Sequence, residues 1–418
     1  MVIARAVGDE VAALERWSAG PAEVHERVAH RFRRVEVRER ARRYLAGLLA
    51  RVERKNGWQL AEAMGEADPH GAQRLLNEAT WDADDVRDDL RADVSEHRGD
   101  AASGVLIVDE TGFPQQGTRS CGVASRYCGT AGTTANAQVG VFLAYASARG
   151  TAFIDRARYL PRAWTRDRAR RVAAGVPKGT RFATKITLAK RLLARAFGVG
   201  VPARWVVADS FYGRSHALRR WLEQRERPYV LMIPKTTTVE YAGRRERAEQ
   251  LGARLREDAW HGTAGGQQWV CLDLTGASAS GMGRWLLVRR AADAGELAYQ
   301  LAYGPAGTTS AELLRVCAVR WRIEEGFAQA QGELGLDHYA VRHWEAWHRF
   351  MTLCLLAHAY LAVLHLHARV PGAATAPPAH RAGGPASRAR TRGRSRAVGV
   401  PPRWSRWRRR HQAAAARS

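Results

Sequence analysis

The stretches GVLIVDE (104–110) and RWVVADSF (204–211) decide the fold of this chain. Each is a continuous apolar run that ends in an acid, Asp109 in the first and Asp209 in the second. Runs of this kind predict strands buried on both faces, as in a parallel or mixed sheet. A carboxylate at the end of such a strand lies at the sheet edge, where α/β proteins place their sites. The same position also suits a helix N-cap or a turn-forming Asp, so both interpretations stay open.

Strand-like and amphipathic segments alternate around these two stretches. Along the chain the order is three strands, a helix, a strand, a helix and a strand, which predicts a mixed α/β sheet. The strand segments are 104–110, 135–147, 151–161, 204–211 and 228–234, and the helical segments are 182–198 and 215–226.

Changes in composition divide the chain into five predicted parts. They are a helical region at 1–98, the first part of the α/β domain at 99–234, a β-rich insertion at 235–308, the helical end of the α/β domain at 309–370, and an Arg-rich tail at 371–418. Within the insertion, short strands are predicted at 267–274, 284–291 and 296–304. The tail lacks the apolar content needed for a core, so its composition predicts disorder.

Two long segments near the C-terminal end are predicted helices. Residues 310–335 have helical character, with Ser310 as the expected N-cap. The apolar stretch at 351–368 is long enough to raise a membrane span, but three histidines interrupt it. This polarity favours a buried core helix over a membrane helix.

The net charge points to a polyanionic partner. The 418 residues include 66 Lys and Arg against 41 Asp and Glu, a formal net charge of +25. The tail at 371–418 supplies +12 of this charge, and residues 27–55 form a second concentration of +8. Nucleic acid is the usual partner of a strongly basic protein, and an acidic membrane surface is the competing interpretation. An apolar content of 46% excludes wholesale disorder.

Other features exclude several classes of protein. The five cysteines are an odd number without a C-x-x-C pair, which fits reduced thiols and a cytoplasmic location rather than a disulfide framework or zinc site. The first residues contain no apolar core of signal-peptide length. No phosphate-binding G-x-x-x-x-G-K-[ST] loop and no G-x-S-x-G nucleophile elbow occur, so neither ATP dependence nor serine hydrolysis is indicated.

Three segments together carry a family resemblance. VDETGFPQQG (108–117), WVVADSFYG (205–213) and RWRIEEGFAQAQGELGLDHYAVRHW (320–344) resemble, in order and separation, the three catalytic blocks of DDE transposases. The resemblance is to enzymes of bacterial insertion sequences that carry a β-rich insertion before the final Glu. It covers about residues 20–370 and implies a ribonuclease-H-like fold preceded by a helical DNA-binding region.

The resemblance implies that Asp109, Asp209 and Glu324 form the catalytic triad and ligate the metal. The cofactor that the resemblance implies is a pair of Mg²⁺ ions, with Mn²⁺ as a substitute. In a two-metal site, one ion activates the attacking oxygen and the other stabilises the leaving oxygen. Carboxylate oxygens are the ligands that Mg²⁺ prefers.

The family also carries a Y-x-x-R-x-x-x-E-x-x-x-x-x-x-K signature around its Glu. Arg320 and Glu324 match it, whereas Cys317 replaces the Tyr and Gln331 replaces the Lys. Glu325 is an alternative to Glu324, although the spacing from Arg320 favours Glu324. A plain i,i+4 ion pair between Arg320 and Glu324 is the simpler structural interpretation. The predicted DNA-binding residues are Arg320 and Gln331, together with the basic residues Arg33, Arg34, Arg42, Arg43, Arg406 and Arg408.

The resemblance and the charge together predict a DNA transposase. Such an enzyme binds terminal inverted repeats, cleaves at the transposon 3′ ends and transfers them to target DNA by two-metal phosphoryl transfer. A homodimer in the synaptic complex and a cytoplasmic, nucleoid-associated location in a prokaryote are expected, with no membrane partner. The alternatives are a catalytically inactive DNA-binding remnant that acts as a repressor, and a metal-dependent nuclease without strand transfer.

Overall fold

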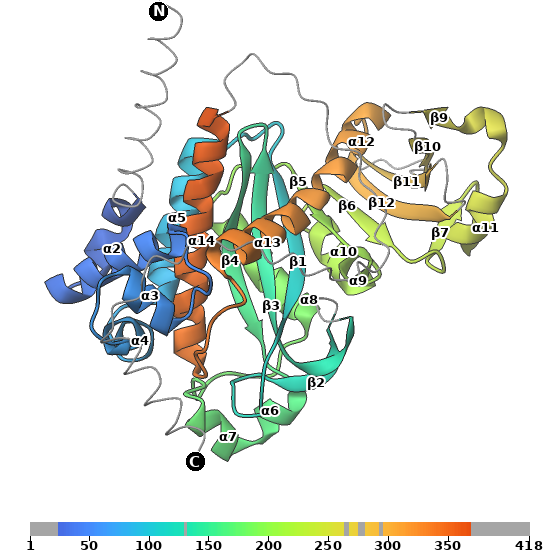
Figure 1. Ribbon diagram of the computed structural model, residues 1–418. Helices are drawn as coiled ribbons and strands as arrows, with labels where there is room; N and C mark the ends of the chain where they lie inside the picture. The colour runs from blue at the N-terminus through green and yellow to red at the C-terminus, as the bar shows by residue number, and fades with distance from the viewer. Residues whose placement is uncertain (1–23, 129–131, 263–266, 275–280, 292–295, 369–418) are drawn as a thin grey trace, which may run out of the picture.

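The computed structural model describes residues 24–128, 132–262, 267–274, 281–291 and 296–368. Its centre is a ten-stranded mixed sheet in which nine strands have the order β2-β3-β1-β5-β6-β12-β11-β10-β9 (Figure 1). The tenth strand, β4, pairs with residues 139–147 of β3, whereas β2 pairs with residues 133–137. The strands are β1 (Val105–Pro114), β2 (Ala124–Cys128), β3 (Thr133–Ser147), β4 (Gly150–Tyr159), β5 (Trp205–Ala208), β6 (Tyr229–Ile233), β9 (His261–Gly262), β10 (Gln267–Asp273), β11 (Met282–Ala291) and β12 (Leu297–Pro305). A separate hairpin joins β7 (Thr238–Tyr241) and β8 (Arg244–Arg247).

Helices cover both faces of this sheet. They are α2 (Val35–Leu49), α3 (Gly57–Ala63), α4 (His70–Asn77), α5 (Ala83–Arg98), α6 (Arg162–Arg166), α7 (Arg168–Ala173), α8 (Lys185–Gly198), α9 (Ser210–Gly213), α10 (His216–Glu223), α11 (Ala248–Ala253), α12 (Ser310–Val319), α13 (Trp321–Leu334) and α14 (Trp344–Ala368), with short 3-10 turns at Ala29–Arg31 and Glu257–Ala259. Phe142 on β3 packs against Phe327 of α13, whereas Asp155 on β4 reaches Arg195 of α8. Asp155 is in register with Leu143, the position after Phe142. Because successive positions of a strand point to opposite faces, α13 and α8 lie on opposite sides of the sheet.

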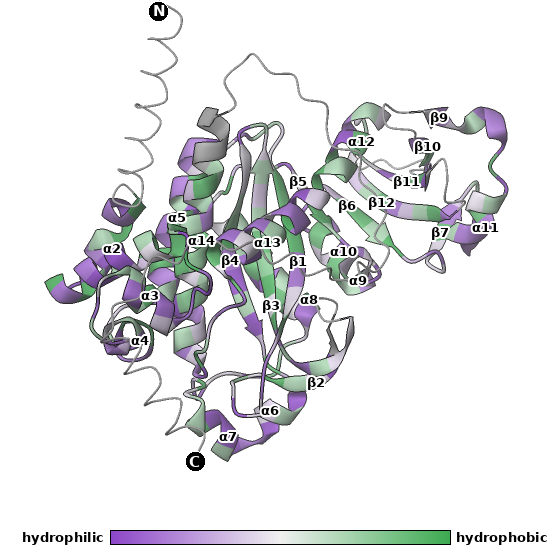
Figure 2. Ribbon diagram, in the orientation of Figure 1, coloured by the Kyte–Doolittle hydropathy of each residue, from purple (hydrophilic) through white to green (hydrophobic). Residues whose placement is uncertain are grey.

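The predicted mixed α/β sheet is confirmed. β1 pairs with β5 and β5 with β6 in parallel, while β3 runs antiparallel to both β1 and β4. The apolar run Val105–Val108 is at most 1% exposed, as expected for a strand covered on both faces. The hydropathy colouring shows the same pattern, with apolar central strands beneath helices whose outer sides are polar (Figure 2).

The predicted helix at 310–335 is divided in the structure. α12 ends at Val319 and α13 begins at Trp321, with Arg320 between them. The expected N-cap Ser310 was wrong, because the Thr309 side chain accepts the Glu312 amide at 3.2 Å and Ser310 is the first helical residue. Both residues bear a hydroxyl, and local sequence does not discriminate between adjacent capping hydroxyls.

The predicted core helix at 351–368 forms the later part of α14. This helix packs against β4, α5 and the N-terminal helices α2 and α4. Its residues from Phe350 to Leu355 are at most 1% exposed. None of the helices in the described ranges combines the length and apolar character that a bilayer crossing requires.

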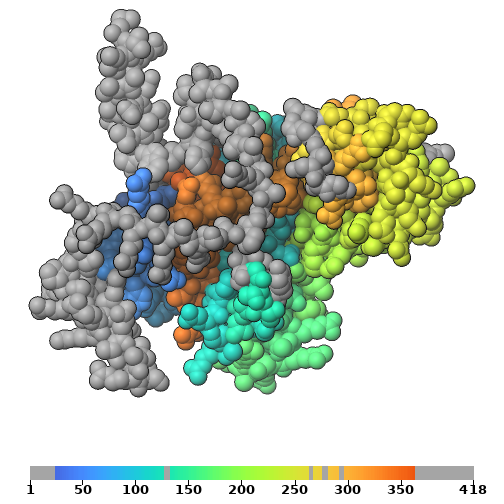
Figure 3. All heavy atoms as spheres, turned by 45° about the vertical axis from the view of Figure 1, so that its right-hand side comes forward, coloured from blue at the N-terminus to red at the C-terminus, as the bar shows by residue number. Residues whose placement is uncertain are grey.

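The strands predicted at 267–274, 284–291 and 296–304 are present as β10, β11 and β12. They continue the central sheet, because β12 pairs antiparallel with β6 over the register Tyr299↔Ile233 to Tyr303↔Tyr229. In the space-filling view this segment forms a lobe at one end of the molecule (Figure 3). The division at residues 235 and 308 remains a prediction.

Candidate active site

Asp109 and Asp209 lie side by side in the middle of the sheet, where the pairing of β1 with β5 ends. β1 and β5 are adjacent parallel strands, and their last paired residues are Val108 and Ala208. Each aspartate follows directly after its member of this pair. Because neighbouring strands are about 4.8 Å apart, this register brings the two carboxylates into one site. The two acids therefore meet as expected, but only Asp209 ends its strand. The prediction that Asp109 ends a strand was wrong, because β1 continues to Pro114 by pairing with β3.

Backbone amides hold both carboxylates in place. The Glu110 amide donates to Asp109 Oδ1 at 2.7 Å. Asp209 begins α9, and its Oδ1 accepts the amides of Phe211 at 3.0 Å and Tyr212 at 3.2 Å. The N-cap interpretation of Asp209 is thus correct, and it is compatible with a functional role, because one carboxylate oxygen suffices for the cap.

The electrostatics of the pair favour binding of a proton or a cation. Burial, followed by the nearby charge of Asp209, raises the pKa of Asp109 to about 7. Burial also raises the pKa of Asp209, and Glu110 adds to this effect. Arg320 acts in the opposite direction and lowers the pKa of both aspartates. Two half-buried carboxylates with this little compensation match the donor set of a hard divalent cation.

Glu324 forms an ion pair with Arg320, the arginine whose charge acts on both aspartates. Arg320 is 8% exposed, and its Nη1 donates to Glu324 Oε1 at 2.7 Å. The Glu324 side chain itself is 43% exposed. Across the described ranges, no group of three or more His, Cys, Asp or Glu side chains is arranged to hold a metal ion. The structure therefore brings Asp109 and Asp209 together, and pairs Glu324 with the arginine whose charge acts on both aspartates.

Glu110 is a residue of the site that the sequence analysis did not identify. Its carboxylate accepts hydrogen bonds from Lys185 of α8 and from the hydroxyl of Tyr212 in α9. Lys185 Nζ also lies 3.7 Å from the centre of the Phe211 ring. These contacts connect α8 and α9 to the middle of β1. The only signal in the sequence was that Glu110 directly follows Asp109.

The predicted DNA-binding residues are distributed over several elements. Arg33 and Arg34 are exposed just before α2, and the exposed Arg42 and Arg43 both donate to Glu39. Gln331 is half-buried on α13, seven positions after Glu324. Arg406 and Arg408 lie outside the described residues.

A small cavity adjoins the site on the side of the β-rich segment. Its volume is about 190 Å³, and its lining includes Trp269 and Arg289 from the lobe, together with Cys317, Arg320 and Trp321. Trp321 is 49% exposed, and the Arg320 guanidinium lies 4.3 Å from its ring centre. Cys317, which stands where the resembling family has Tyr, therefore lies one helical turn from the arginine of the site.

A mixed sheet with two neighbouring aspartates on adjacent parallel strands, placed directly after the last residues that pair, is consistent with a ribonuclease-H-like nuclease. The family model described as DDE superfamily endonuclease matches residues 27–269, and the chain belongs to this family. The matched region includes Asp109 and Asp209. The chain is also 29% identical over 170 residues to a probable transposase for insertion sequence element IS701 from Microchaete diplosiphon. That match covers 40% of this chain and 41% of the relative. The predicted membership of the DDE enzymes is confirmed.

Proposed function

We propose that the chain is a DNA transposase that cuts the ends of its own element and joins them to target DNA. The observation that carries the proposal is that Asp109 and Asp209 lie next to each other, directly after the last paired residues of β1 and β5, in a chain of the DDE endonuclease family. The insertion-sequence relative supports the step from nuclease to transposase. The positive charge of +25 supports a DNA substrate.

Asp109 and Asp209 are the residues that would hold a divalent cation. Bound there, Mg²⁺ or Mn²⁺ would supply activation of the attacking oxygen and stabilisation of the leaving oxygen. The amides on Oδ1 of each aspartate keep the carboxylates oriented. Arg320 keeps them ionised, because it lowers the pKa of both.

Glu324 completes the triad in this proposal by exchanging its partner. In the structure it accepts from Arg320, which also faces the aspartates. With a cation held by the aspartates, Arg320 would be available to a DNA phosphate. The exposed carboxylate of Glu324 would then be free to turn toward Asp109 and Asp209. Residues 24–98 would help to recognise the DNA ends, and two protomers would pair the two ends.

The test uses the full chain and a plasmid that carries the native element with its flanking DNA. Cleavage at the element ends is expected with Mg²⁺ and not with EDTA. Asp109→Asn and Asp209→Asn should each reduce cleavage by more than about 100-fold, because loss of an outer partner of a metal ligand already costs about 10–100-fold. Asp258→Asn, an exposed change in the same residue type, should leave the rate unchanged.

The products separate the competing functions. Joined element–target DNA supports a transposase, whereas cleavage without joining identifies a nuclease. End binding without cleavage in Mg²⁺ or Mn²⁺ identifies an inactive DNA-binding protein. Full cleavage by Asp109→Asn would refute the assignment of the site.

A further inference from the structure

A second, larger cavity lies at the outer edge of the sheet. Its volume is about 510 Å³, within the ~300–1,000 Å³ typical of ligand sites. The edge strand β4, the first turns of α5 and α14, helix α8 and the loop at 177–183 form its walls. Arg156 on β4 is in register with Phe142 on β3, which is in register with Asp109 on β1. The cavity is thus about two strand spacings, roughly 10 Å, from the aspartate pair.

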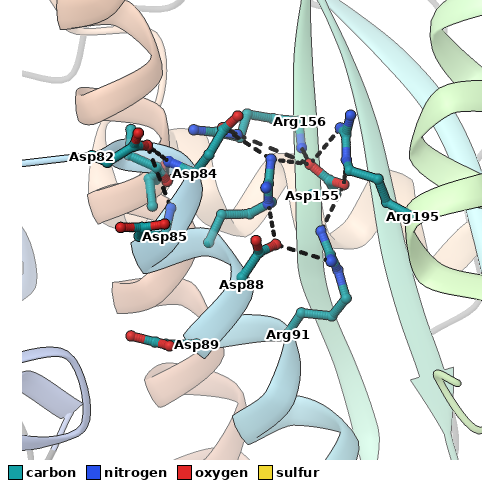
Figure 4. Close-up of polar contacts among 12 residues, drawn as sticks. Asp82, Asp84, Asp85, Asp88, Asp89, Arg91, Asp155, Arg156 and Arg195 are labelled. Carbon is teal, nitrogen blue, oxygen red and sulfur yellow. Dashed lines mark hydrogen bonds and ion pairs between the residues drawn. The ribbon is translucent and has the colours of Figure 1, made fainter. Parts of the chain in front are cut away.

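Arginine dominates the lining of this cavity. Six arginines contribute to it, namely Arg87, Arg156, Arg158, Arg181, Arg191 and Arg195, against the three acids Asp82, Asp84 and Glu345. Nearby acids form ion pairs with some of these arginines, as Figure 4 shows for Arg156 and Arg195. Asp84 pairs with Arg87 and Arg156, and the fully buried Asp155 pairs with Arg195. Within the described residues, no ion pair reaches Arg158, Arg181 or Arg191.

Arg158 is the clearest sign of an absent counter-charge. It is 2% exposed, and burial lowers the pKa of its guanidinium. Its Nη1 donates to the His343 carbonyl at 3.4 Å, and its face lies 5.0 Å from the Trp347 ring centre. Its Nε and Nη2 have no hydrogen-bond partner among the described residues. A buried cation without a counter-charge is costly in free energy, so an anion in the cavity would stabilise Arg158.

Arg156 adds a second buried guanidinium at the same place. It is also 2% exposed, and its Nε and Nη2 likewise lack partners among the described residues, although Nη1 donates to Asp84 at 2.7 Å. Arg181 and Arg191 are exposed at the rim. Charge therefore extends from the surface to the base of the cavity. The forked guanidinium suits the tetrahedral oxygens of phosphate.

The helices around the cavity favour an anion as well. α5 and α14, of 16 and 25 residues, both begin at its wall and direct their positive dipole ends toward it. His348 contributes no charge near neutral pH, because burial and the nearby Arg156 lower its pKa to about 3. The lining is thus cationic through its arginines alone.

We propose that this cavity binds a phosphate group, carried either by a DNA backbone or by a small phosphorylated compound. The proposal does not depend on the cleavage reaction, because the cavity shares no lining residue with the aspartate pair. Its position at the carboxyl end of β4, which runs in the same direction as β1, leaves it open to a DNA strand that crosses the sheet edge.

The first arm of the test measures the melting temperature of the full chain in inorganic phosphate against chloride of equal ionic strength. At 100-fold above its Kd, phosphate should raise the Tm by roughly 3 °C. Arg158→Gln should remove this response without lowering the Tm in chloride, since the variant loses an uncompensated buried charge. Arg191→Gln tests the same site from the exposed rim, where folding is not at risk. Arg168→Gln on α7, exposed and outside the lining, is the matched control.

The second arm measures the affinity of a labelled DNA duplex as a function of salt. If a backbone phosphate is the ligand, Arg191→Gln should lower the salt slope by about 1 relative to Arg168→Gln, and inorganic phosphate should compete. If a free phosphate compound is the ligand, Arg191→Gln should lose the rise in Tm with phosphate but keep the salt slope of Arg168→Gln. Either result supports the site. Variants that match Arg168→Gln in both arms would overturn it, and so would a parent chain that responds to phosphate no more than to chloride.

Discussion

At the scale of single residues, Arg320 decides the state of the site. It lies close enough to lower the pKa of Asp109 and Asp209, and it also binds Glu324 at 2.7 Å. The sequence predicted the Arg320–Glu324 pair from its i,i+4 spacing. The link from this pair to the aspartates depends on how α13 packs over β1, which no local spacing encodes.

Replacing Arg320 should change how cleavage depends on pH. Asp109 takes up a proton as the pH falls through about 7, and a protonated carboxylate is a poor cation ligand. Arg320→Gln removes a charge that lowers this pKa, so the pH at half-maximal rate should move upward. Arg320→Lys keeps the charge and should stay near the parent profile. Rates at fixed Mg²⁺ concentration across the pH range provide the measurement, and identical profiles for the two variants would contradict the role of the charge.

His348 should make the fold sensitive to acid. Its pKa of about 3 in the folded chain lies below its usual value of 6.5. The unfolded chain therefore binds a proton first, and stability present above pH 6.5 is lost as the pH falls toward 3. Between pH 6.5 and 5 this loss is up to about 2 kcal/mol. Denaturant titrations should show a smaller loss for His348→Gln, while the exposed His216→Gln should lose as much as the parent.

At the scale of elements, α9 turns the end of β5 into a fixed position for Asp209. Asp209 caps this four-residue helix, and Gly213 ends it against β6. A Cβ at Gly213 would lie 1.8 Å from the Met232 carbonyl oxygen, so only glycine permits this approach. The sequence showed the glycine in WVVADSFYG without showing which strand it would meet.

Gly213→Ala should therefore be costly. The backbone of α9 or β6 must shift, and overpacking of this kind typically costs about 1–3 kcal/mol. Cleavage should fall as well, because the shift moves the amides that hold Asp209. The control is Gly198→Ala at the end of α8, where a Cβ meets nothing within 4 Å. Equal unfolding free energies for the two variants in a denaturant titration would contradict the close approach.

Helix α13 is held on the sheet by aromatic contacts. The Phe327 ring lies 5.3 Å from the Phe142 ring and 4.9 Å from the Phe153 ring, centre to centre. Phe327→Ala should lower the free energy of unfolding by about 3 kcal/mol or more, and Phe327→Leu by much less, since most of the volume is kept. Urea titrations distinguish the two. A loss of less than about 1 kcal/mol for the alanine variant would show that other contacts position α13.

At the scale of the whole molecule, one sheet connects the parts that the composition separated. The strands of 267–305 extend the sheet beyond β6, and the N-terminal helices pack on α14. Because the pairing of β12 with β6 joins residues far apart in sequence, periodicity alone predicted the strands but not their place. The basic concentration at 27–55 thus belongs to a folded helical surface on the side of the molecule away from the lobe (Figure 1).

The salt dependence of DNA binding should locate this surface. Arg33 and Arg34 are exposed, and no ion pair reaches them among the described residues. Replacing both with Gln should reduce the slope of log K against log salt by about 2, if each contacts a phosphate. Arg166→Gln with Arg168→Gln makes the same charge change on α6 and α7. Equal slopes for the two double variants would place DNA contact elsewhere.

The sequence by itself determined the central strands, their order along the chain and the two acids that follow their buried runs, because such runs are local patterns. It also determined membership of the DDE enzymes through three ordered blocks. Only the tertiary structure decided that Glu110 joins Lys185 and Tyr212, that the charge of Arg320 acts on both aspartates, and that Arg156 and Arg158 line one cavity. These contacts depend on strand register, on helix packing and on the removal of charges from water. Each of these joins residues distant in sequence, so no local pattern records it.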